Sequence, residues 1–363
     1  MLELADIEPY LRDRGLISAR AVVDSGFRVA DRSRANRVFV VTAEAQRCLV
    51  VKAARNPRSL DVAREAAVLE RLWALDTGGR LSRFLPKVVC YDRAEGALIL
   101  ETELGRDLRE HHARGRFSRG LAALAGRALA ALHDLGPSTA DELPGRVELA
   151  RPPRPHEPDL ESLRSMSSAA IELTRAIQAS ERLCAALDEI YESWASESAV
   201  HGDIRWDNCL VMRTAGSGRW SRLLLLDWQL AGPGDPGLDV GAFLGEYLHA
   251  WLQSIPIVST RDPGRLLSHS GVPLTRIGPA VGDFWDAYTS CRQHGTVHPA
   301  EMLPRAMRFA AVRLLGAALE EAQTLAELRP RVLLLVPLSE NVLTRPDAAS
   351  ARLLGLGEPS GVQ

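Results

Sequence analysis

The sequence contains 363 residues, of which 46% are hydrophobic and 25% are charged. This composition is typical of a folded globular chain and excludes collagen-like, disulfide-rich and intrinsically disordered classes. The formal net charge of -2 predicts no broad basic surface, so we expect no nucleic-acid partner. The length exceeds that of one ordinary core, and we therefore expect one or two domains that share a cleft.

Two features of the sequence bear on its compartment. The five cysteines are scattered and form no C-x-x-C pair, which indicates neither a zinc site nor a disulfide framework. Residues 1–6 carry acidic side chains where a signal peptide would be basic, and no apolar run approaches the roughly 20 residues of a membrane span. We therefore expect a cytoplasmic protein without a membrane partner. Nothing in the sequence indicates an oligomeric state.

The first hundred residues predict a compact α+β unit. Apolar positions at helical spacing indicate a loose helix that ends near Gly15 and a second helix over 62–73. Between and after these helices, β-branched and apolar residues predict two antiparallel hairpins. Their strands are expected at 37–41 with 47–52, and at 88–91 with 97–100.

The rest of the chain is expected to be mainly helical, to about residue 328. Leucine- and alanine-rich segments predict helices over 121–135 and 160–195, and the proline-dense segment 151–158 predicts an exposed connector. Two short strands are expected within 200–230. The predicted divisions are an N-terminal lobe over 1–104, a helical C-terminal lobe over 105–344 and a flexible tail over 345–363.

The strongest chemical signal is the segment V-H-G-D-I-R-W-D-N-C-L-V at 200–211, which is followed by the apolar run 223–226 and Asp227. Phosphoryl transfer needs a carboxylate that orients the attacking hydroxyl and accepts its proton, and oxygen ligands that hold Mg²⁺ against a triphosphate. Asp203 suits the first task as the catalytic residue. Asn208 and Asp227 suit the second as metal ligands, because Mg²⁺ prefers hard oxygen donors.

The spacing of these three residues favours a kinase over a simple turn. An Asp, four intervening residues and an Asn, followed about 20 residues later by an Asp after a strand, match the catalytic and metal loops of eukaryotic-type kinases. The alternative is that His201, Asp203 and Asn208 form a polar turn, since Asp and Asn favour turns. Under that alternative, the presence of apolar strands on both sides of the segment and of Asp227 after the second strand would be a coincidence.

Two signatures in this half of the sequence resemble the aminoglycoside phosphotransferase family. Its members carry H-G-D where protein kinases carry H-R-D, as residues 201–203 do, and a D-W/F-E-like metal motif before a G-D-P-x-x-D-L-A-like helix start, similar to 227–229 and 234–241. The resemblance covers about residues 20–325 and implies a bilobal protein-kinase-like fold. It also implies that His201 and Asp239 are structural supports, with Asp239 hydrogen-bonding the loop backbone.

A kinase also needs a cation for the α- and β-phosphates, held by a carboxylate from a neighbouring helix. Lys52 ends a predicted strand and is one of only two lysines in the chain, and a compact ammonium suits bridging phosphates better than a forked guanidinium. Glu65 lies in the first turns of the following predicted helix. The alternatives are that Lys52 is a solvated edge charge and that Glu70 of the same helix replaces Glu65.

The segment 98–108 resembles the family's hinge, where extended backbone between the lobes pairs with the adenine edge. The resemblance implies contacts from the carbonyl of Glu101 and the amide of Glu103, and the alternative is an ordinary strand that leaves a hairpin. Two departures from kinase patterns are present. Between residues 24 and 40, where a phosphate-cradling loop belongs, Gly26 is the only glycine and no G-x-G-x-x-G occurs; the segment 30–38 stands in its place. Gln229 replaces a frequent acid, which weakens the case for a second Mg²⁺.

Together these residues predict a phosphotransferase that uses ATP and Mg²⁺, with a hydroxyl of a small molecule such as an antibiotic, sugar or amino alcohol as acceptor. A second hypothesis is phosphorylation of Ser or Thr in a peptide, as in lanthipeptide-like natural-product biosynthesis. A third is a pseudokinase or nucleotide-binding module. The acceptor pocket is expected within 157–194 and 245–321. These ranges contain a mixture of acidic and aromatic residues of which none is diagnostic, and most are expected to be surface or core residues: Glu246, Trp251, Asp283, Trp285, Asp286, Tyr288 and Glu320.

Overall fold

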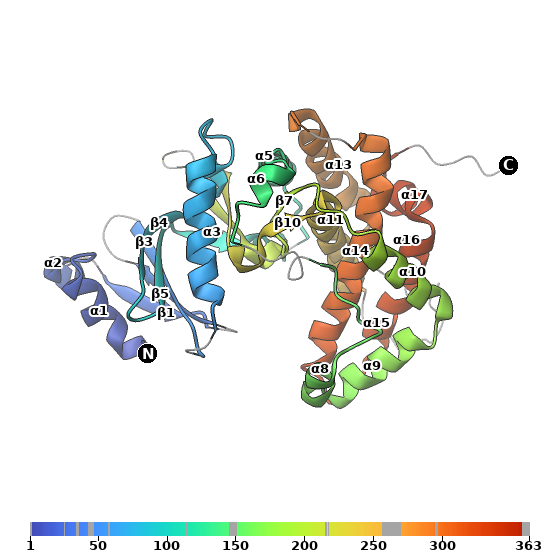
Figure 1. Ribbon diagram of the computed structural model, residues 1–363, viewed down its shortest axis with the longest axis horizontal. Helices are drawn as coiled ribbons and strands as arrows, with labels where there is room; N and C mark the ends of the chain where they lie inside the picture. The colour runs from blue at the N-terminus through green and yellow to red at the C-terminus, as the bar shows by residue number, and fades with distance from the viewer. Residues whose placement is uncertain are drawn as a thin grey trace.

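The computed structural model places an N lobe that contains a sheet beside a larger C lobe of helices (Figure 1). It describes residues 2–24, 26–33, 36–42, 47–56, 59–113, 115–144, 151–214, 216, 218–255, 270–294 and 297–357. The predicted division after residue 104 falls between β5 (Ala97–Glu103) and β6 (Gly105–Asp107), which belong to different sheets. The predicted fold class, α+β with a kinase-like arrangement of sheet and helices, is confirmed.

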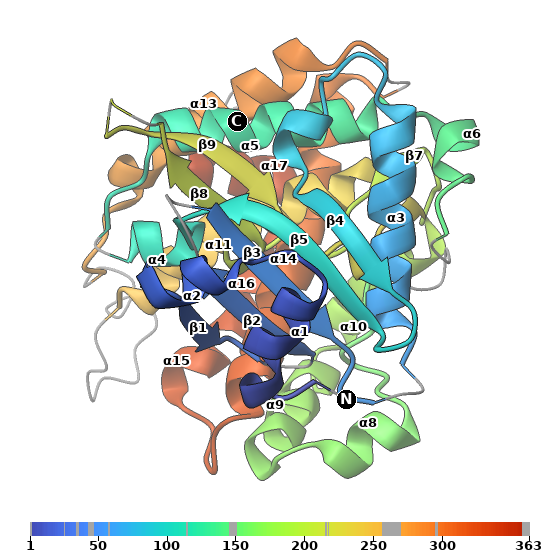
Figure 2. The same cartoon turned by 90° about the vertical axis from the view of Figure 1, so that its left-hand side faces the viewer.

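The N lobe is built on an antiparallel sheet with the strand order β1-β2-β3-β5-β4. Its other strands are β1 (Arg28–Asp31), β2 (Arg37–Thr42), β3 (Arg47–Ala53) and β4 (Lys87–Asp92). Both predicted hairpins are confirmed, whereas β1 was not predicted. Figure 2 looks onto this lobe and shows α1 (Ile7–Asp13) and α2 (Ala19–Asp24) in front of the sheet. Figure 1 shows α3 (Asp61–Leu75) on the side towards the C lobe.

Alternate residues of the central strands enter different cores, because successive side chains of a strand point to opposite faces. In β5, Leu98 and Leu100 pack in the core shared with α3, whereas Ile99 packs in the core shared with α1. The same alternation in β3 puts Val51 in the α1 core and turns the next residue, Lys52, towards α3. A shift of one residue in strand register would turn Lys52 away from that helix.

Long helices packed in pairs form most of the C lobe. Helix α5 (Arg119–His133) packs against α13 (Leu274–Cys291), and α11 (Pro236–Gln253) packs against α14 (Pro299–Ala322). The short strands form the pair β7 (Ser198–Val200) with β10 (Gly232–Gly234) and the sheet of β6, β8 (Cys209–Arg213) and β9 (Trp220–Leu225). Among the described residues, none of the helices combines the length and the apolar composition needed to span a bilayer.

Shorter helices and turns complete the described chain. The helices are α4 (Leu108–His112), α6 (Pro137–Ala140), α8 (Leu160–Ser165), α9 (Ser168–Gln178), α10 (Glu181–Glu192), α15 (Pro330–Leu333), α16 (Leu335–Thr344) and α17 (Pro346–Ala349). The turns are the 3₁₀ segments η1 (Leu4–Asp6), η2 (Ser82–Phe84), η3 (Trp206–Asn208) and η4 (Trp228–Leu230), and the π-helical segment η5 (Ser350–Leu354).

The predicted helical segment 160–195 contains three helices, α8, α9 and α10. Each begins after a residue whose side chain accepts a hydrogen bond from a backbone N–H of the first turn: Asp159, Ser167 and Ser180. Such side-chain caps satisfy N–H groups that have no partner within the helix. The three starts therefore carried a signal in the sequence, since Asp and Ser are preferred at this position.

The predicted flexible tail was wrong for residues 346–357. Residues 346–354 form α17 and η5, and the side chains of Ala349, Leu354 and Leu356 are buried. The three residues belong to the same apolar core as α13 and α14. The tail is ordered because it covers these helices, a contact that local composition does not reveal. Residues 358–363 lie outside the described part of the chain.

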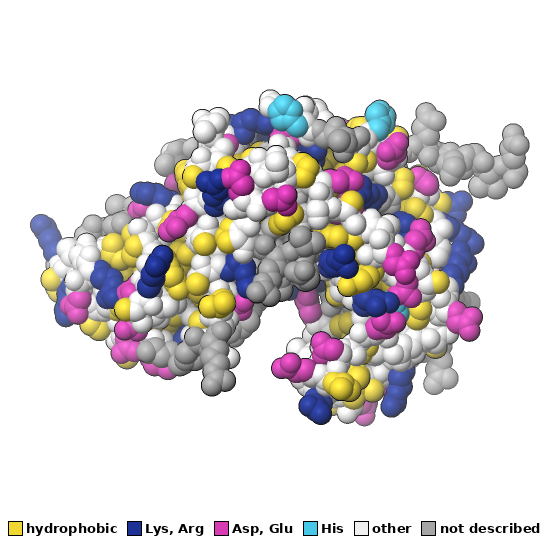
Figure 3. Space-filling view, in the orientation of Figure 1, with side chains coloured by type: hydrophobic (Ala, Val, Ile, Leu, Met, Phe, Trp, Pro, Cys, Tyr) yellow, Lys and Arg dark blue, Asp and Glu magenta, His cyan; other side chains and the backbone are white. Residues whose placement is uncertain are grey.

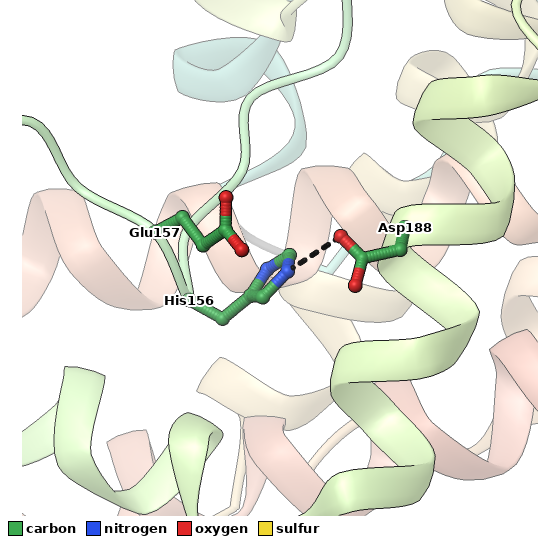
Figure 4. A group of neighbouring side chains, drawn as sticks. All are labelled: His156, Glu157 and Asp188. Atoms are coloured by element: carbon green, nitrogen blue, oxygen red, sulfur yellow. Dashed lines mark hydrogen bonds and ion pairs between the residues drawn. The ribbon is translucent and has the colours of Figure 1, made fainter.

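The predicted exposed connector, 151–158, is partly buried. His156 is buried, and its Nε2 lies 3.0 Å from Oδ1 of Asp188 in α10. Figure 4 shows the His156 ring between the carboxylates of Glu157 and Asp188. These residue types resemble a metal-ligand set, but the guanidinium of Arg154 pairs with both acids. The group therefore fastens the connector to α10 through ion pairs.

Gly241 marks the closest approach of α11 and α14. A Cβ at this position would lie 2.2 Å from the carbonyl oxygen of Ala306 and 2.6 Å from Cβ of Phe309. We expect Gly241→Ala to force the helices apart and to lower the free energy of unfolding by about 1–3 kcal/mol, as measured by urea denaturation. Gly282→Ala in α13 is the control, because a Cβ there meets nothing within 4 Å. It should leave the midpoint unchanged or raise it; an unchanged midpoint for Gly241→Ala would contradict the close contact.

Candidate functional site

The candidate site begins where β7 ends at Val200, and its first turn requires a glycine. Gly202 has a φ of 80°, a left-handed conformation that side chains rarely adopt. A Cβ at Gly202 would also lie 2.8 Å from the carbonyl oxygen of Leu230. Conformation and space therefore both explain the glycine between His201 and Asp203.

The carboxylate of Asp239, in the first turn of α11, holds the turn at His201 and Gly202 in place. It is fully buried, and it accepts hydrogen bonds from the backbone N–H of His201 at 2.7 Å and of Gly202 at 3.0 Å. These are the contacts that the family resemblance implies. A third donor is Nε2 of His133, at 3.2 Å from Oδ2. Burying a carboxylate costs free energy unless hydrogen-bond donors such as these stabilise it. The hydrogen bonds therefore keep both the turn and the carboxylate in position.

The His201 ring joins the turn to the strand that precedes Asp227. Its Nε2 donates to the carbonyl oxygen of Leu226 at 3.0 Å, and its Nδ1 accepts from the backbone N–H of Asp203 at 3.3 Å. Burial lowers the pKa of His201, which keeps the ring neutral with one donor and one acceptor. The bridge sets the position of Asp203 relative to Asp227.

Asp203 is a half-buried carboxylate with a raised pKa. Its Oδ2 and its own carbonyl oxygen accept from Nδ2 of Asn208, at 3.0 and 2.9 Å. Burial raises the pKa of Asp203 to about 6; the charge of Asp227 acts in the same direction, and Arg205 opposes it. A carboxylate whose pKa lies near neutrality is suited to accept a proton from a substrate.

Lys52 lies between two acids from different lobes. Its Nζ is 2.7 and 2.8 Å from the two oxygens of Glu65 in α3, and 3.3 Å from Oδ1 of Asp227. Burial alone would lower the pKa of Lys52, but the two carboxylates outweigh it and raise the pKa. Glu70 lies on the exposed side of α3, so the structure pairs Lys52 with Glu65. The ammonium is a buried, permanently charged group at the junction of the lobes.

Asp227 adopts an unusual backbone conformation. Among the described residues it is the only non-glycine residue with a positive φ, at 70°. The next residue, Trp228, is fully buried, and its backbone N–H lies 3.4 Å from Oε1 of Glu65. A left-handed residue after a strand marks a functional turn more often than a packing accident. Here it turns the Asp227 side chain towards Lys52.

The predicted hinge runs along the edge between the lobes. Glu101 lies opposite Leu49 of β3 and Lys87 of β4, and its side chain pairs with Lys87 at 2.8 Å. The side chain of Glu103, the last residue of β5, pairs with Arg222 of β9. Both side chains therefore make ion pairs, and the predicted backbone contacts with adenine stay a prediction.

One side-chain contact joins the two positions that depart from the family pattern. Nδ2 of Asn36, in the predicted phosphate-loop segment, donates to Oε1 of Gln229 at 3.3 Å. Asn36 lies in the N lobe just before β2, and Gln229 lies in η4 of the C lobe. Both side chains are uncharged amides. An acidic residue at position 229 would place a negative charge at this contact. Arg34 and Ala35 of the same segment lie outside the described residues.

Sequence reasoning missed a buried ion cluster next to the Asp203 loop. Glu246 in α11 is fully buried and accepts from Nη2 of Arg109 at 2.6 Å and from Nε of Arg313 at 3.0 Å. Arg109 also pairs with Asp207 of the loop. No local pattern identifies these residues, because the partners come from α4, α11, α14 and η3. The cluster fixes the far end of the loop, as Asp239 fixes its start.

Several candidates for the acceptor pocket are taken up by the fold. Glu246, Trp251 and Tyr288 are buried and belong to the core of the C lobe. Asp283 pairs with Arg119 of α5 at 2.7 Å. Two of the seven residues contact the Asp203 loop: Glu246 accepts from the backbone N–H of Trp206 at 3.4 Å, and Glu320 pairs with Arg205 at 3.2 Å.

The comparisons with known proteins establish the family. Residues 27–261 match the family model described as the phosphotransferase enzyme family. The match covers more than half of the chain, and the protein therefore belongs to this family, as the H-G-D and metal-loop signatures predicted. No curated protein matches the sequence.

The structural comparisons agree on the fold. A choline/ethanolamine kinase family protein from Mesorhizobium loti is 18% identical, with 92% of this chain and 95% of that chain covered and a TM-score of 0.52. A choline kinase from Cryptosporidium parvum Iowa II is 11% identical, with 96% of each chain covered and a TM-score of 0.53. At these identities the likeness establishes the fold of this chain as kinase-like.

The raised pKa of Asp203 gives a prediction for pH dependence. Its pKa in the folded state, about 6, lies above the ordinary 3.8, so folding favours the protonated form and this group destabilises the fold as pH rises between these values. We expect the carboxyl carbon of Asp203 to titrate near pH 6 in a carbon-13 NMR experiment. The Asp203→Asn variant should gain stability relative to the wild type between pH 4 and pH 7. A titration midpoint near 4 would contradict the buried environment described above.

Proposed function

We propose that the protein is an ATP- and Mg²⁺-dependent O-phosphotransferase that moves the γ-phosphate of ATP to a hydroxyl group of a small molecule. The observation that carries this proposal is the convergence of Asp203, Asp227 and the Lys52–Glu65 pair at the junction of the lobes. Family membership supports the phosphotransfer chemistry. A reaction that consumes ATP also favours the cytoplasm as its compartment.

Asp203 has the properties of the group that receives the hydroxyl proton. Its pKa of about 6 leaves it mostly ionised at neutral pH, yet closer in proton affinity to a substrate than an ordinary carboxylate is. Asn208 donates to one carboxylate oxygen and so orients it. The loop is fastened at both ends, by Asp239 and by the Arg109–Glu246 pair. A rigid base keeps the acceptor hydroxyl in line with the phosphate.

The residues fit Mg²⁺ and a nucleotide. Asp227 is a third exposed, and its described contact with Lys52 uses Oδ1 alone. Asn208 uses its amide nitrogen for Asp203, which makes its Oδ1 the atom suited to a metal. Both are hard oxygen donors of the kind that Mg²⁺ prefers. Bound Mg²⁺ would neutralise phosphate charge, and the Lys52 ammonium would add to that effect. The backbone of 101–103 is the proposed place for adenine.

The proposed role of Lys52 in nucleotide binding is tested by replacing each of the two lysines of the chain with arginine. We expect Lys52→Arg to lower the affinity for ATP with Mg²⁺ at least tenfold, or about 1.4 kcal/mol, because a guanidinium does not fit the buried place beside Glu65. Isothermal titration calorimetry measures the affinity. Lys87→Arg is the matched control, since Lys87 is largely exposed and pairs only with Glu101 among the described residues; it should bind as the wild type does. Equal affinities for both variants would remove Lys52 from nucleotide binding.

The role of Asp203 is tested by Asp203→Asn, which keeps the size of the side chain and removes its basicity. ATP should bind to this variant with unchanged affinity, whereas turnover should fall by about 10²- to 10⁴-fold. Turnover is measured on an acceptor identified by ATP-dependent mass gain in a screen of amino alcohols, sugars, antibiotics and Ser- or Thr-containing peptides. Asp13→Asn, at the exposed end of α1 in the N lobe, is the control. Undiminished turnover of Asp203→Asn would exclude it as the base.

A peptide is the second candidate acceptor, and one observation favours it. Figure 3 shows the surface hollowed between the N lobe and the segment that carries α8 and α9. Leu160 and Leu163 of α8 are exposed apolar side chains. An open hollow with apolar contacts admits an extended acceptor as well as a compact one. The same screen separates the two acceptor classes, since mass gain on a peptide but on none of the small alcohols would select the second.

A further inference from the structure

A second cavity lies in the C lobe, apart from the candidate site. Its volume is about 560 Å³, within the range of small-molecule sites. It opens where α6, the start of α11, the end of α13 and the start of α14 meet, at the top of the view in Figure 1, whereas α8 and α9 lie at the bottom. None of Lys52, Asp203 and Asp227 lines it.

The lining defines a ligand chemistry. Pro137, Pro236, Val297 and Met302 are apolar residues of the lining. Thr289 also lines the cavity, and its hydroxyl donates to the carbonyl oxygen of Trp285 at 2.9 Å. The charged groups of the lining already have partners. Glu197 pairs with Arg305 at 3.0 Å, and Arg292 pairs with Asp134 at 3.2 Å. A charged ligand would gain no free counter-charge among these pairs and would lose its hydration. The lining therefore favours an uncharged, mainly apolar molecule, and the volume of about 560 Å³ admits one that contains a ring.

The floor of the cavity is part of a hydrogen-bonded chain that ends at the Asp203 loop. Nη1 of Arg292 donates to the hydroxyl oxygen of Tyr288 at 3.0 Å, and the Tyr288 hydroxyl lies 3.0 Å from Nδ1 of His133. Nε2 of His133 lies 3.2 Å from Asp239. Because Asp239 is an acceptor, His133 donates from Nε2, and its Nδ1 accepts a hydrogen bond from the Tyr288 hydroxyl. Asp239 in turn holds the backbone of His201.

The other end of the chain reaches the N lobe. Asp134 pairs with Arg292 at 3.2 Å, and it accepts from Nη1 of Arg80 at 2.8 Å. Arg80 lies between α3 and η2, and it also donates to Oε1 of Gln293 and to the carbonyl oxygen of Cys291, each at 2.7 Å. Arg80 is thus a connection of the N lobe to the end of α13. A ligand in the cavity would therefore contact His133, which supports the Asp203 loop through Asp239, and Asp134, which pairs with Arg80 of the N lobe.

We propose that this cavity is a binding site for an uncharged, ring-containing small molecule, and that its occupation alters the Asp203 loop through the chain Arg292–Tyr288–His133–Asp239. The cavity is separate from the residues proposed to bind the nucleotide and from Asp203, none of which lines it. Filling it would move Tyr288 or Arg292, and any such movement changes the support of the His201 and Gly202 amides. The second site would therefore regulate the first without contact between their ligands.

Binding is tested with named probes and a variant that fills the cavity. Indole, benzyl alcohol and coumarin are uncharged ring compounds, and saturation-transfer NMR detects their binding at millimolar concentration. We expect at least one to bind the wild-type chain and to lose its signal with Thr289→Trp, which places an indole in the cavity. Ser290→Trp is the matched control, because Ser290 is the next residue of α13, is exposed and does not line the cavity.

Ser196→Trp fills the cavity from an exposed position on the opposite wall and serves if Thr289→Trp does not fold. Absence of binding to the wild type would overturn the proposal. Binding that persists in both folded cavity variants would overturn it as well, because the probe would then occupy another place.

Coupling to the loop is tested by hydrogen exchange of the His201 and Gly202 amides. These are the two amides that donate to Asp239. We expect a bound probe to change their exchange rates at least threefold, and to leave them unchanged in Thr289→Trp. Unaltered rates with the probe bound would overturn the coupling. The readout requires no phosphotransfer, so a chain that binds the probe but no nucleotide would refute the proposed function and leave this site standing.

Discussion

The buried carboxylate of Asp239 is the constraint on which the site depends. It carries a negative charge with no exposed surface, and three donors stabilise it: the amides of His201 and Gly202 and the ring of His133. A buried charge with a missing partner costs several kcal/mol. The fold therefore keeps the end of β7, the start of α11 and the end of α5 in one arrangement. This arrangement turns a polar loop into a rigid support for Asp203.

The position of Lys52 follows from the covered sheet in the same way. Because β3 has a core on each face, its register is strongly specified, and Lys52 must point to the side where Glu65 lies. Asp227 reaches the ammonium from the other lobe through its left-handed turn. The carboxylates of Glu65 in the N lobe and Asp227 in the C lobe thus both contact the same ammonium nitrogen, Nζ of Lys52. The junction is an electrostatic contact between the lobes as well as the proposed place of the phosphates.

The sequence predicted the parts of the site that rest on short spacing. The hairpins follow from strand periodicity, and the Asp203–Asn208 contact follows from one turn of chain. The sequence left Glu65 and Glu70 as alternatives, and the structure decides between them, since Glu65 pairs with Lys52 whereas Glu70 is exposed. The cluster of Glu246, Arg109 and Arg313 escaped prediction. Its partners lie 67 and 137 residues from Glu246, and surface charge is the usual role of such residues.

By itself the sequence determined the class of chemistry, because the motifs that bear on phosphoryl transfer occupy a few residues with fixed spacing. It also determined the alternation of side chains along β3, which sets the face of the sheet to which Lys52 points. Only the tertiary structure decided which side chains are available for anything else. It buried Glu246, Trp251 and Tyr288, ordered the chain to residue 357, and left a cavity beside the His133–Tyr288 pair. The physical reason is that burial and pairing are set by contacts between distant segments, which have no local pattern.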